Sequence, residues 1–219
     1  MKKILGVAVL MAAGAALAAT ELDSSMLGFV PVAASGLTAV SVPVTGYTPG
    51  ESIKIAEVLQ TANLTAGDKL YTLNDDGTYN QYTLNSSKAW KPAKVVTVVG
   101  SQINESTADA PEVATVTRGK AFWIQTSAEQ VNIMGQATTD AGSLPTLSTG
   151  WQMIGNPSMT TALKVSTITA PGSGSRLNVG ANAYQKGKNG SWLKLPDYDT
   201  INDDDDVIPV GAGAMLLCK

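Results

Sequence analysis

Histidine is absent from the 219 residues of this chain. Its absence excludes the Ser-His-Asp triad, the Cys-His pair and every metal site that depends on imidazole ligands. The short motifs G-x-S-x-G and the P-loop are also absent. Hydrolysis by a pair of carboxylates is still compatible with the sequence, although the spacing of the Asp and Glu residues does not identify a particular pair. We therefore predict a protein that is not an enzyme and keep a carboxylate-dependent hydrolase as an alternative.

Cysteine occurs once, as Cys218. A single cysteine cannot form an internal disulfide, so the stability of the fold must come from packing. The apolar residues before Cys218 predict a strand near the end of the chain. The alternative role for this cysteine is an intermolecular disulfide with a second chain.

Charged residues are scarce as well, at 15% of the chain, and the net charge is −3. A nucleic-acid-binding protein would carry a stripe of lysine and arginine, and the sequence has none. The partners that we predict are instead a second copy of the chain, a cell-surface component or a glycan.

The N-terminus has the order of a secretory signal. Lys2 and Lys3 precede a short apolar run that ends in small residues at Ala18. The alternative, an uncleaved membrane anchor, is disfavoured by the length and the Ala-rich composition of the run. No later segment reaches the about 20 apolar residues that cross a bilayer. The sequence predicts an exported protein, located in the periplasm, at the cell surface or outside the cell, without a transmembrane segment after cleavage.

Several blocks of sequence occur twice in the same order. "GLTAVSVPVT" from Gly36 matches "GWQMIGNPSM" from Gly150, and "IKIAEV" matches "LKVSTI". "VTRGKAFWI", ending at Ile124, matches "PVGAGAMLL", ending at Leu217. The first copy is longer because it carries the insertion "SSKAWKPAKVVTVVGSQINESTADAPE". Matching blocks in a fixed order indicate an internal repeat.

The longest of these blocks has the pattern of a β-hairpin in both copies. "GDKLYTLNDDGTYNQY" matches "GANAYQKGKNGSWLKL", which pairs Tyr71 with Tyr184. Before this block, Leu64 is paired with Leu177. An Asp-Gly and an Asn-Gly dipeptide interrupt the apolar arms, and both favour the tight turns of hairpins.

The matches predict how the chain is divided. The segments are a signal peptide (1–18), an N-terminal strand segment (19–35), a first β repeat (36–126), a linker loop (127–149) and a second β repeat (150–219). The linker is predicted from a stretch rich in Thr, Ser, Gly and Pro.

Strand signals dominate both repeats. Val40, Val42 and Val44 alternate with other residues at a period of two, and short apolar runs are separated by turns. The spacing of apolar residues between Ile55 and Ala62 predicts one short helix. We predict an all-β fold, a pseudo-symmetric β-sandwich or barrel with one shared core and at most one or two short helices. Two separate small domains are the alternative.

One segment, "DYDTINDDDDVI", concentrates acidic side chains. Carboxylates are the ligands that calcium prefers, although the spacing is not that of an EF-hand loop. The alternative is a solvated acidic loop before the last strand. The candidate calcium ligands are Asp197, Asp199, Asp203, Asp204, Asp205 and Asp206.

The chain has four tryptophans, and an exposed one would suit the stacking of a sugar ring. Trp123 and Trp151 lie in apolar repeated blocks, which predicts core positions for them. Trp90 lies in the insertion between two lysines and is the candidate for an exposed glycan contact. This candidate supports a carbohydrate-binding module as an alternative function, by analogy of fold.

The pairing of "GWQMIGNP" with "RGKAFWI" resembles segments of a loosely defined group of exported bacterial proteins. Those proteins carry stretches like G-W-N-x-I-G-N-P and G-x-A-F-W-I. The resemblance covers the repeated blocks alone. It implies an exported, β-rich protein and no particular activity.

These observations favour a structural or interaction protein of the bacterial envelope or exterior, which acts by association with itself or with a surface component. A strand at the edge of a sheet is a template for joining another chain. The last strand, "IPVGAGAMLLCK", and the early segment "SMLGFVPVAA" are the predicted edges.

Overall fold

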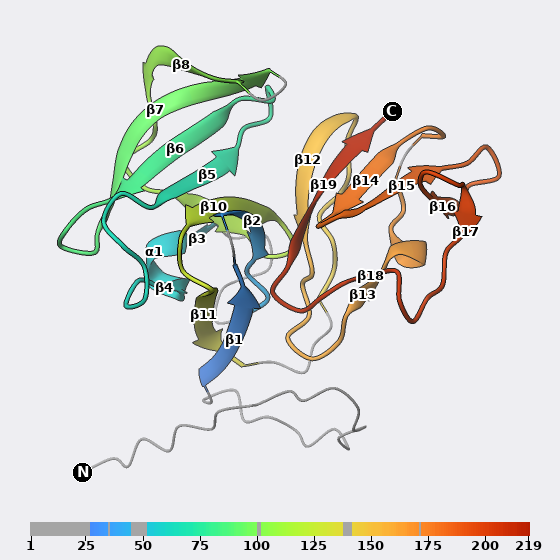
Figure 1. Cartoon of the computed structure of the whole chain (residues 1–219), viewed down its shortest axis with the longest axis horizontal. Helices are drawn as coiled ribbons and strands as arrows, with labels where there is room; N and C mark the ends of the chain where they lie inside the picture. Colours follow the sequence, from blue (N-terminus) through green and yellow to red (C-terminus); the bar gives the residue numbers. More distant parts are fainter. Residues whose placement is uncertain (1–26, 35, 45–51, 100–101, 138–141, 171) are drawn as a thin grey trace.

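The structure is a computed structural model that describes residues 27–34, 36–44, 52–99, 102–137, 142–170 and 172–219 (Figure 1). The predicted signal peptide lies outside the described residues. Strands dominate, and the two helices are single turns, α1 (Ile55–Val58) and the 3-10 helix η1 (Val165–Thr167). Every sheet within the described residues is antiparallel and open, with two edge strands. The all-β, sandwich-like prediction is confirmed, and no barrel closes in this part of the chain.

Two six-stranded sheets form most of the molecule, and they lie side by side in Figure 1. The first sheet has the order β2-β10-β5-β6-β7-β8, and the second has the order β12-β19-β14-β15-β16-β17. The first contains β2 (Gly36–Ser41), β5 (Lys69–Leu73), β6 (Tyr79–Leu84), β7 (Trp90–Val99), β8 (Gln102–Asp109) and β10 (Ala121–Thr126). The second contains β12 (Gly150–Gly155), β14 (Arg176–Val179), β15 (Asn182–Lys186), β16 (Trp192–Lys194), β17 (Asp199–Thr200) and β19 (Gly213–Cys218).

Three smaller sheets complete the fold beneath the two large ones (Figure 1). A three-stranded sheet has the order β1-β11-β4, and two-stranded sheets pair β3 with β9 and β13 with β18. Their bounds are β1 (Leu27–Ala33), β3 (Ser52–Lys54), β4 (Leu59–Gln60), β9 (Thr115–Thr117), β11 (Gln130–Gln136), β13 (Leu163–Lys164) and β18 (Val207–Ile208).

The predicted linker loop 127–149 is wrong over its first part, because it contains strand β11. Val131 and Ile133 alternate with polar residues in this strand and are fully buried. The strand pairs with β1 along its whole length and with β4 at its centre. The Thr- and Ser-rich composition of the later residues hid this short alternating pattern. The helix after Ile55 is also shorter than predicted, because Leu59 leaves it to pair with Ile133 in the sheet.

The strand ladders change the predicted matching of the central blocks. Leu70 lies opposite Tyr82 on one neighbouring strand and Ile124 on the other. Leu177 lies in the same way opposite Tyr184 and Leu216. By sheet position, Tyr184 therefore corresponds to Tyr82, and the predicted pairing of Tyr71 with Tyr184 is wrong.

Two further predicted matches between the repeats are also wrong. Leu177 corresponds to Leu70 and not to Leu64, and Ile124 corresponds to Leu216 and not to Leu217. The cause is that similar Asp-Gly and Asn-Gly turns occur in successive hairpins of the sheet. The first turn joins β5 to β6, whereas the second joins β15 to β16.

The two sheets meet through reciprocal backbone contacts, which we call the junction. Ser41 donates its N–H to the carbonyl of Gly211 at 2.8 Å, and Gly155 donates to the carbonyl of Gly119 at 2.8 Å. Two isolated bridges, Val40 with Ala212 and Lys120 with Ile154, accompany these bonds. These two hydrogen bonds and two bridges are therefore reciprocal between the halves.

Small residues allow this close approach of the sheets. A Cβ atom on Gly155 would lie 2.3 Å from the Cβ of Ser41, and one on Gly213 would lie 2.4 Å from the Cβ of Ala121. Neither distance is sterically allowed, so glycine is required at both positions while the sheets keep this spacing.

The buried apolar side chains form two clusters and not the single shared core that the sequence predicts. One cluster lies under the first sheet and includes residues of β1, β11 and α1. The other lies between the second sheet and the elements β13, η1 and β18. The two clusters are connected, because Met159 and Val210 from the second half pack against the first cluster.

Candidate functional site

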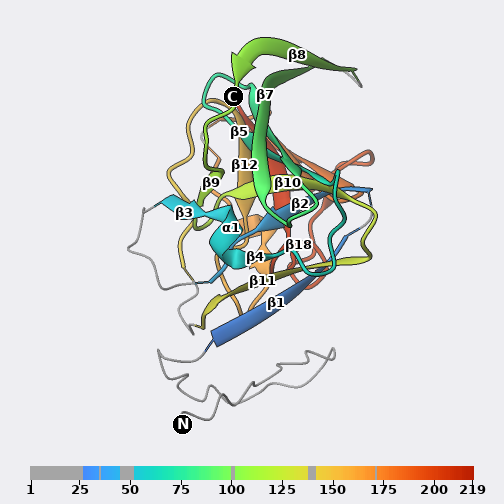
Figure 2. The same cartoon turned by 90° about the vertical axis from the view of Figure 1, so that its left-hand side faces the viewer.

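The hairpin of β7 and β8 contains a long strand, β8, that is exposed along its whole length. Figure 2 shows β8 lying across one end of the molecule, beyond β7. All eight residues of β8 are exposed. Val98 and Ile103 are 49% and 52% exposed, and they lie opposite each other across the hairpin. An exposed apolar pair on a projecting hairpin is typical of a contact surface.

One side of β8 also has no strand partner within the described residues, because β8 ends the order of the first sheet. The register shifts between Lys94 and Val96, which marks an irregularity in the ladder. There Ser106 accepts a hydrogen bond from the N–H of Ala108 at 3.1 Å, within the irregular part of β8. Bulges of this kind interrupt edge pairing. The regular free edge is therefore the first half of β8, from Gln102 to Glu105.

The predicted edge in the last strand is wrong. β19 lies inside the second sheet, between β12 and β14, and both its sides are paired. The other predicted edge, in "SMLGFVPVAA", contains β1, which is an edge strand of the three-stranded sheet. Pro31 in the middle of β1 has no N–H to offer a partner strand. β8 contains no proline, so every residue of its free edge has an N–H.

Cys218 is only 2% exposed and belongs to the second core cluster. Burial raises the pKa of its thiol, and the positive charge of Lys186 offsets part of this effect. Gln152 lies against the sulfur, with its Nε2 atom at 3.8 Å. The predicted intermolecular disulfide is therefore inaccessible in the folded protein, because a second chain cannot reach this sulfur.

Within the acidic segment, Asp206 is an anchor of the fold. It is 2% exposed and accepts hydrogen bonds from the Tyr184 hydroxyl at 2.9 Å and from Lys194 Nζ at 2.7 Å. The main-chain N–H of Asn202 donates to it as well, at 2.7 Å. Burial raises the pKa of Asp206, but these hydrogen bonds outweigh burial and hold it below its usual value. Burial and the contact with Asp206 raise the pKa of Tyr184, so its hydroxyl stays protonated as a donor.

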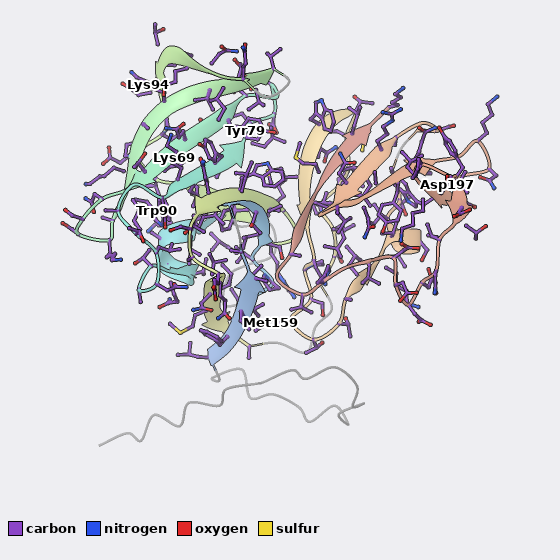
Figure 3. All side chains as sticks on the ribbon, in the orientation of Figure 1. Lys69, Tyr79, Trp90, Lys94, Met159 and Asp197 are labelled. Atoms are coloured by element: carbon purple, nitrogen blue, oxygen red, sulfur yellow. The ribbon has the colours of Figure 1, made fainter. Side chains whose placement is uncertain are left out.

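The other candidate calcium ligands make contacts of their own. Asp203 is 3.7 Å from Lys164, and Asp205 accepts a hydrogen bond from the Asn202 side chain at 2.7 Å. Figure 3 places Asp197 at the outer margin of the second sheet. All six aspartates are described, and no three of them are grouped so that they could hold a metal ion. The calcium site at Asp197, Asp199, Asp203, Asp204, Asp205 and Asp206 stays a prediction.

The tryptophan that is exposed is not the one that the sequence predicts. Trp90 is partly buried against the first core, and its Nε1 atom is enclosed without a hydrogen-bond partner in the described residues. Trp192 is buried and donates to the carbonyl of Ile168 at 2.9 Å. Trp151, for which a core position was predicted, is 47% exposed and lies outside both clusters. The exposed indole is therefore that of Trp151 and not that of Trp90.

Trp151 begins a straight row across the second sheet. It lies opposite Leu217, which lies opposite Arg176, which in turn lies opposite Gln185. Directly opposed residues of antiparallel strands project from the same face. We call these four residues the Trp151 row. The sequence did not reveal this row, because Arg176 and Gln185 lie far from Trp151 along the chain. The order of the strands in the sheet brings them into one row.

The first sheet has a row at the corresponding place. Leu37 lies opposite Gln125, Gln125 opposite Lys69, and Lys69 opposite Thr83. We call these four residues the Leu37 row. Leu37 is 55% exposed, so the two rows have comparable access to solvent. They share an exposed apolar residue at one end and a cation two strands away, but only the Trp151 row has an aromatic ring.

No helix in the part of the chain that the structure describes could cross a membrane. A comparison with protein-family models finds no match for this chain, and comparisons with curated proteins and with solved structures find none either.

Proposed function

We propose that the chain is an exported, non-catalytic interaction protein of the bacterial envelope or exterior, which works by association through the β7–β8 hairpin. The observation that carries this proposal is the exposed pair Val98 and Ile103 beside the free edge of β8. A free edge offers main-chain hydrogen bonds to an added strand, and neighbouring apolar side chains add contact area.

The difference between the two sheets supports the hairpin as the functional element. We infer that the sheets are two copies of one repeated unit, since their strand orders and junction contacts correspond. In the second sheet, β16 and β17 span three and two residues, whereas β7 and β8 span ten and eight. The projecting hairpin is thus an addition to a shared scaffold, and such additions are where function concentrates.

A charged residue at the centre of the hairpin should abolish association. Ile103→Lys places an ammonium group in the apolar pair, and the loss of one buried Ile contact costs about 1.5–3 kcal/mol. We expect binding of the purified protein to isolated cell envelopes, or its self-association in sedimentation experiments, to weaken by about tenfold or more. Because the side chain is half exposed, the melting temperature should change little.

Val113→Lys is the matched control, since Val113 is also an exposed apolar residue but lies outside the hairpin. It should leave association unchanged. Equal binding by the Ile103→Lys variant and the unsubstituted protein would contradict the proposal. Turnover of a polysaccharide that is lost on removal of two carboxylates would instead favour the hydrolase alternative.

A further inference from the structure

We infer that the Trp151 row is a binding site for an anionic polysaccharide. This site is separate from the β7–β8 hairpin and does not depend on the association proposed for it. It consists of an exposed indole at one end, Leu217 beside it, and the polar side chains of Arg176 and Gln185 beyond.

The fold does not use the exposed face of Trp151. The residue lies outside both core clusters and is the second residue of β12, directly after Gly150, whose φ is +104°. A positive φ favours glycine and turns the chain into the strand at this point. An indole that is half exposed on a flat sheet is a rigid platform with a polar N–H, and binding sites favour such side chains.

The spacing of the row suits a chain of sugar rings. Neighbouring strands lie about 4.8 Å apart, so Trp151 and Arg176, which are separated by two such steps, lie about 10 Å apart. If one ring stacks on the indole, the next ring lies over Leu217 and the ring after it lies beside Arg176. A guanidinium group binds a carboxylate or a sulfate through paired hydrogen bonds. The amide of Gln185, one strand further, adds a donor and an acceptor for hydroxyl groups.

Positive side chains of the second sheet lie near the Trp151 row, and its aspartates lie away from Arg176, as an anionic ligand requires. Arg176 begins β14 and Lys188 follows β15, at the end of the sheet where the row crosses it. Lys186, the strand neighbour of Gln185, faces the other side of the sheet, where its Nζ donates to the carbonyl of Ala170. The Lys219 side chain lies over Gly174 at the same end, with Nζ 3.9 Å from the position of a Cβ there. Aspartates within residues 150–219 belong to the segment from Asp197 to Asp206, around β17 and the loop that follows it.

The composition of the row favours a polysaccharide over a lipid surface. A surface that inserts into a membrane presents a continuous apolar face with several large side chains. Here a single aromatic residue and the partly buried Leu217 are followed at once by Arg176 and Gln185. This alternation of one ring with polar groups matches an amphipathic, hydroxyl-rich ligand.

The test uses three anionic polysaccharides as probes, polygalacturonate, hyaluronan and heparin, with neutral dextran as the comparison. Affinity electrophoresis and titration calorimetry of the purified protein should show binding to at least one anionic probe and weaker binding to dextran. Trp151→Ala and Arg176→Gln should each reduce the affinity about tenfold or more. Added salt should weaken binding of the unsubstituted protein, because exposed charges are screened.

The Leu37 row provides matched controls within the same molecule. Leu37→Ala and Lys69→Gln remove an equally exposed apolar side chain and a cation at the corresponding positions, and both should leave binding unchanged. Ile103→Lys should also bind normally, which separates this site from the hairpin. Circular dichroism would verify that all variants are folded.

Three results would overturn the inference. The first is the absence of binding to all three anionic probes, and the second is an equal loss in the Leu37→Ala and Trp151→Ala variants. The third is binding that depends on Trp151 to vesicles of phosphatidylglycerol but to none of the polysaccharides, which would assign the row to a membrane surface.

Discussion

Asp206→Ala should lower the free energy of unfolding by about 3 kcal/mol, because removal of one partner of a buried ion pair leaves the other groups without compensation. The substitution deprives the Tyr184 hydroxyl, the Lys194 ammonium group and the Asn202 N–H of their common acceptor. Lys194 is partly exposed and can recover water, whereas the Tyr184 hydroxyl lies in the buried network. Urea unfolding followed by tryptophan fluorescence would measure the change.

The same variant should show a defined dependence on pH. The pKa of Asp206 is lower in the folded protein than in the unfolded chain, where it is about 3.9. The stability that the carboxylate contributes is therefore fully present above the unfolded pKa and is lost as the pH falls through the folded pKa. The difference between the unsubstituted protein and Asp206→Ala should be constant near neutral pH and shrink in acid.

Asp203→Ala is the control for this experiment, since Asp203 is half exposed and forms a loose pair with Lys164 at 3.7 Å. It should cost less than about 1 kcal/mol. If both variants unfold at the same urea concentration, Asp206 is not the anchor of the acidic loop.

Gly213→Ala should destabilise the protein by about 1–3 kcal/mol, because it forces a methyl group into a closely packed site. The new Cβ would lie 2.4 Å from the Cβ of Ala121, across the junction. Separation of the two atoms would require the sheets to move apart, and this movement would strain the reciprocal bonds of Ser41 and Gly155.

The second substitution Ala121→Gly should restore most of this loss. It removes the contact at 2.4 Å and leaves the Cβ at position 213 with its next neighbour, the Cβ of Ala39, at 3.2 Å. A double-mutant cycle in urea would report the coupling between the two positions. Additive effects of the two substitutions would show that the sheets do not meet at these residues.

Local sequence signals predicted the class of this fold well. Alternating valines, Asp-Gly and Asn-Gly turns and the scarcity of helical patterns all led to an all-β structure, since each reflects the conformation of a few neighbouring residues. The position of a hairpin within a sheet depends instead on distant partners. Tyr71 and Tyr184 look equivalent beside their turns, yet only the ladders show that Tyr184 takes the place of Tyr82.

Exposure was predicted less well than strand content. Trp90 stands between two lysines in the sequence, but its indole packs on the first core. Trp151 stands in an apolar block and projects from the outer face of the second sheet. In a strand, neighbouring residues face opposite sides, so the composition of a block does not decide where one side chain points. The last strand, β19, was mistaken for an edge for a different reason, because its place between β12 and β14 depends on strand order and not on its own sequence.

The reciprocal junction bears on how the two halves of this chain change through evolution. In a homodimer of identical chains, a substitution at an interface is present twice, and its cost is incurred on both sides of the axis. Here each position of the junction is encoded separately, as Ser41 beside Gly155 and Ala121 beside Gly213 illustrate. If the halves descend from one ancestor, the fusion allowed one half to lengthen a hairpin and the other to acquire a tryptophan without altering its counterpart.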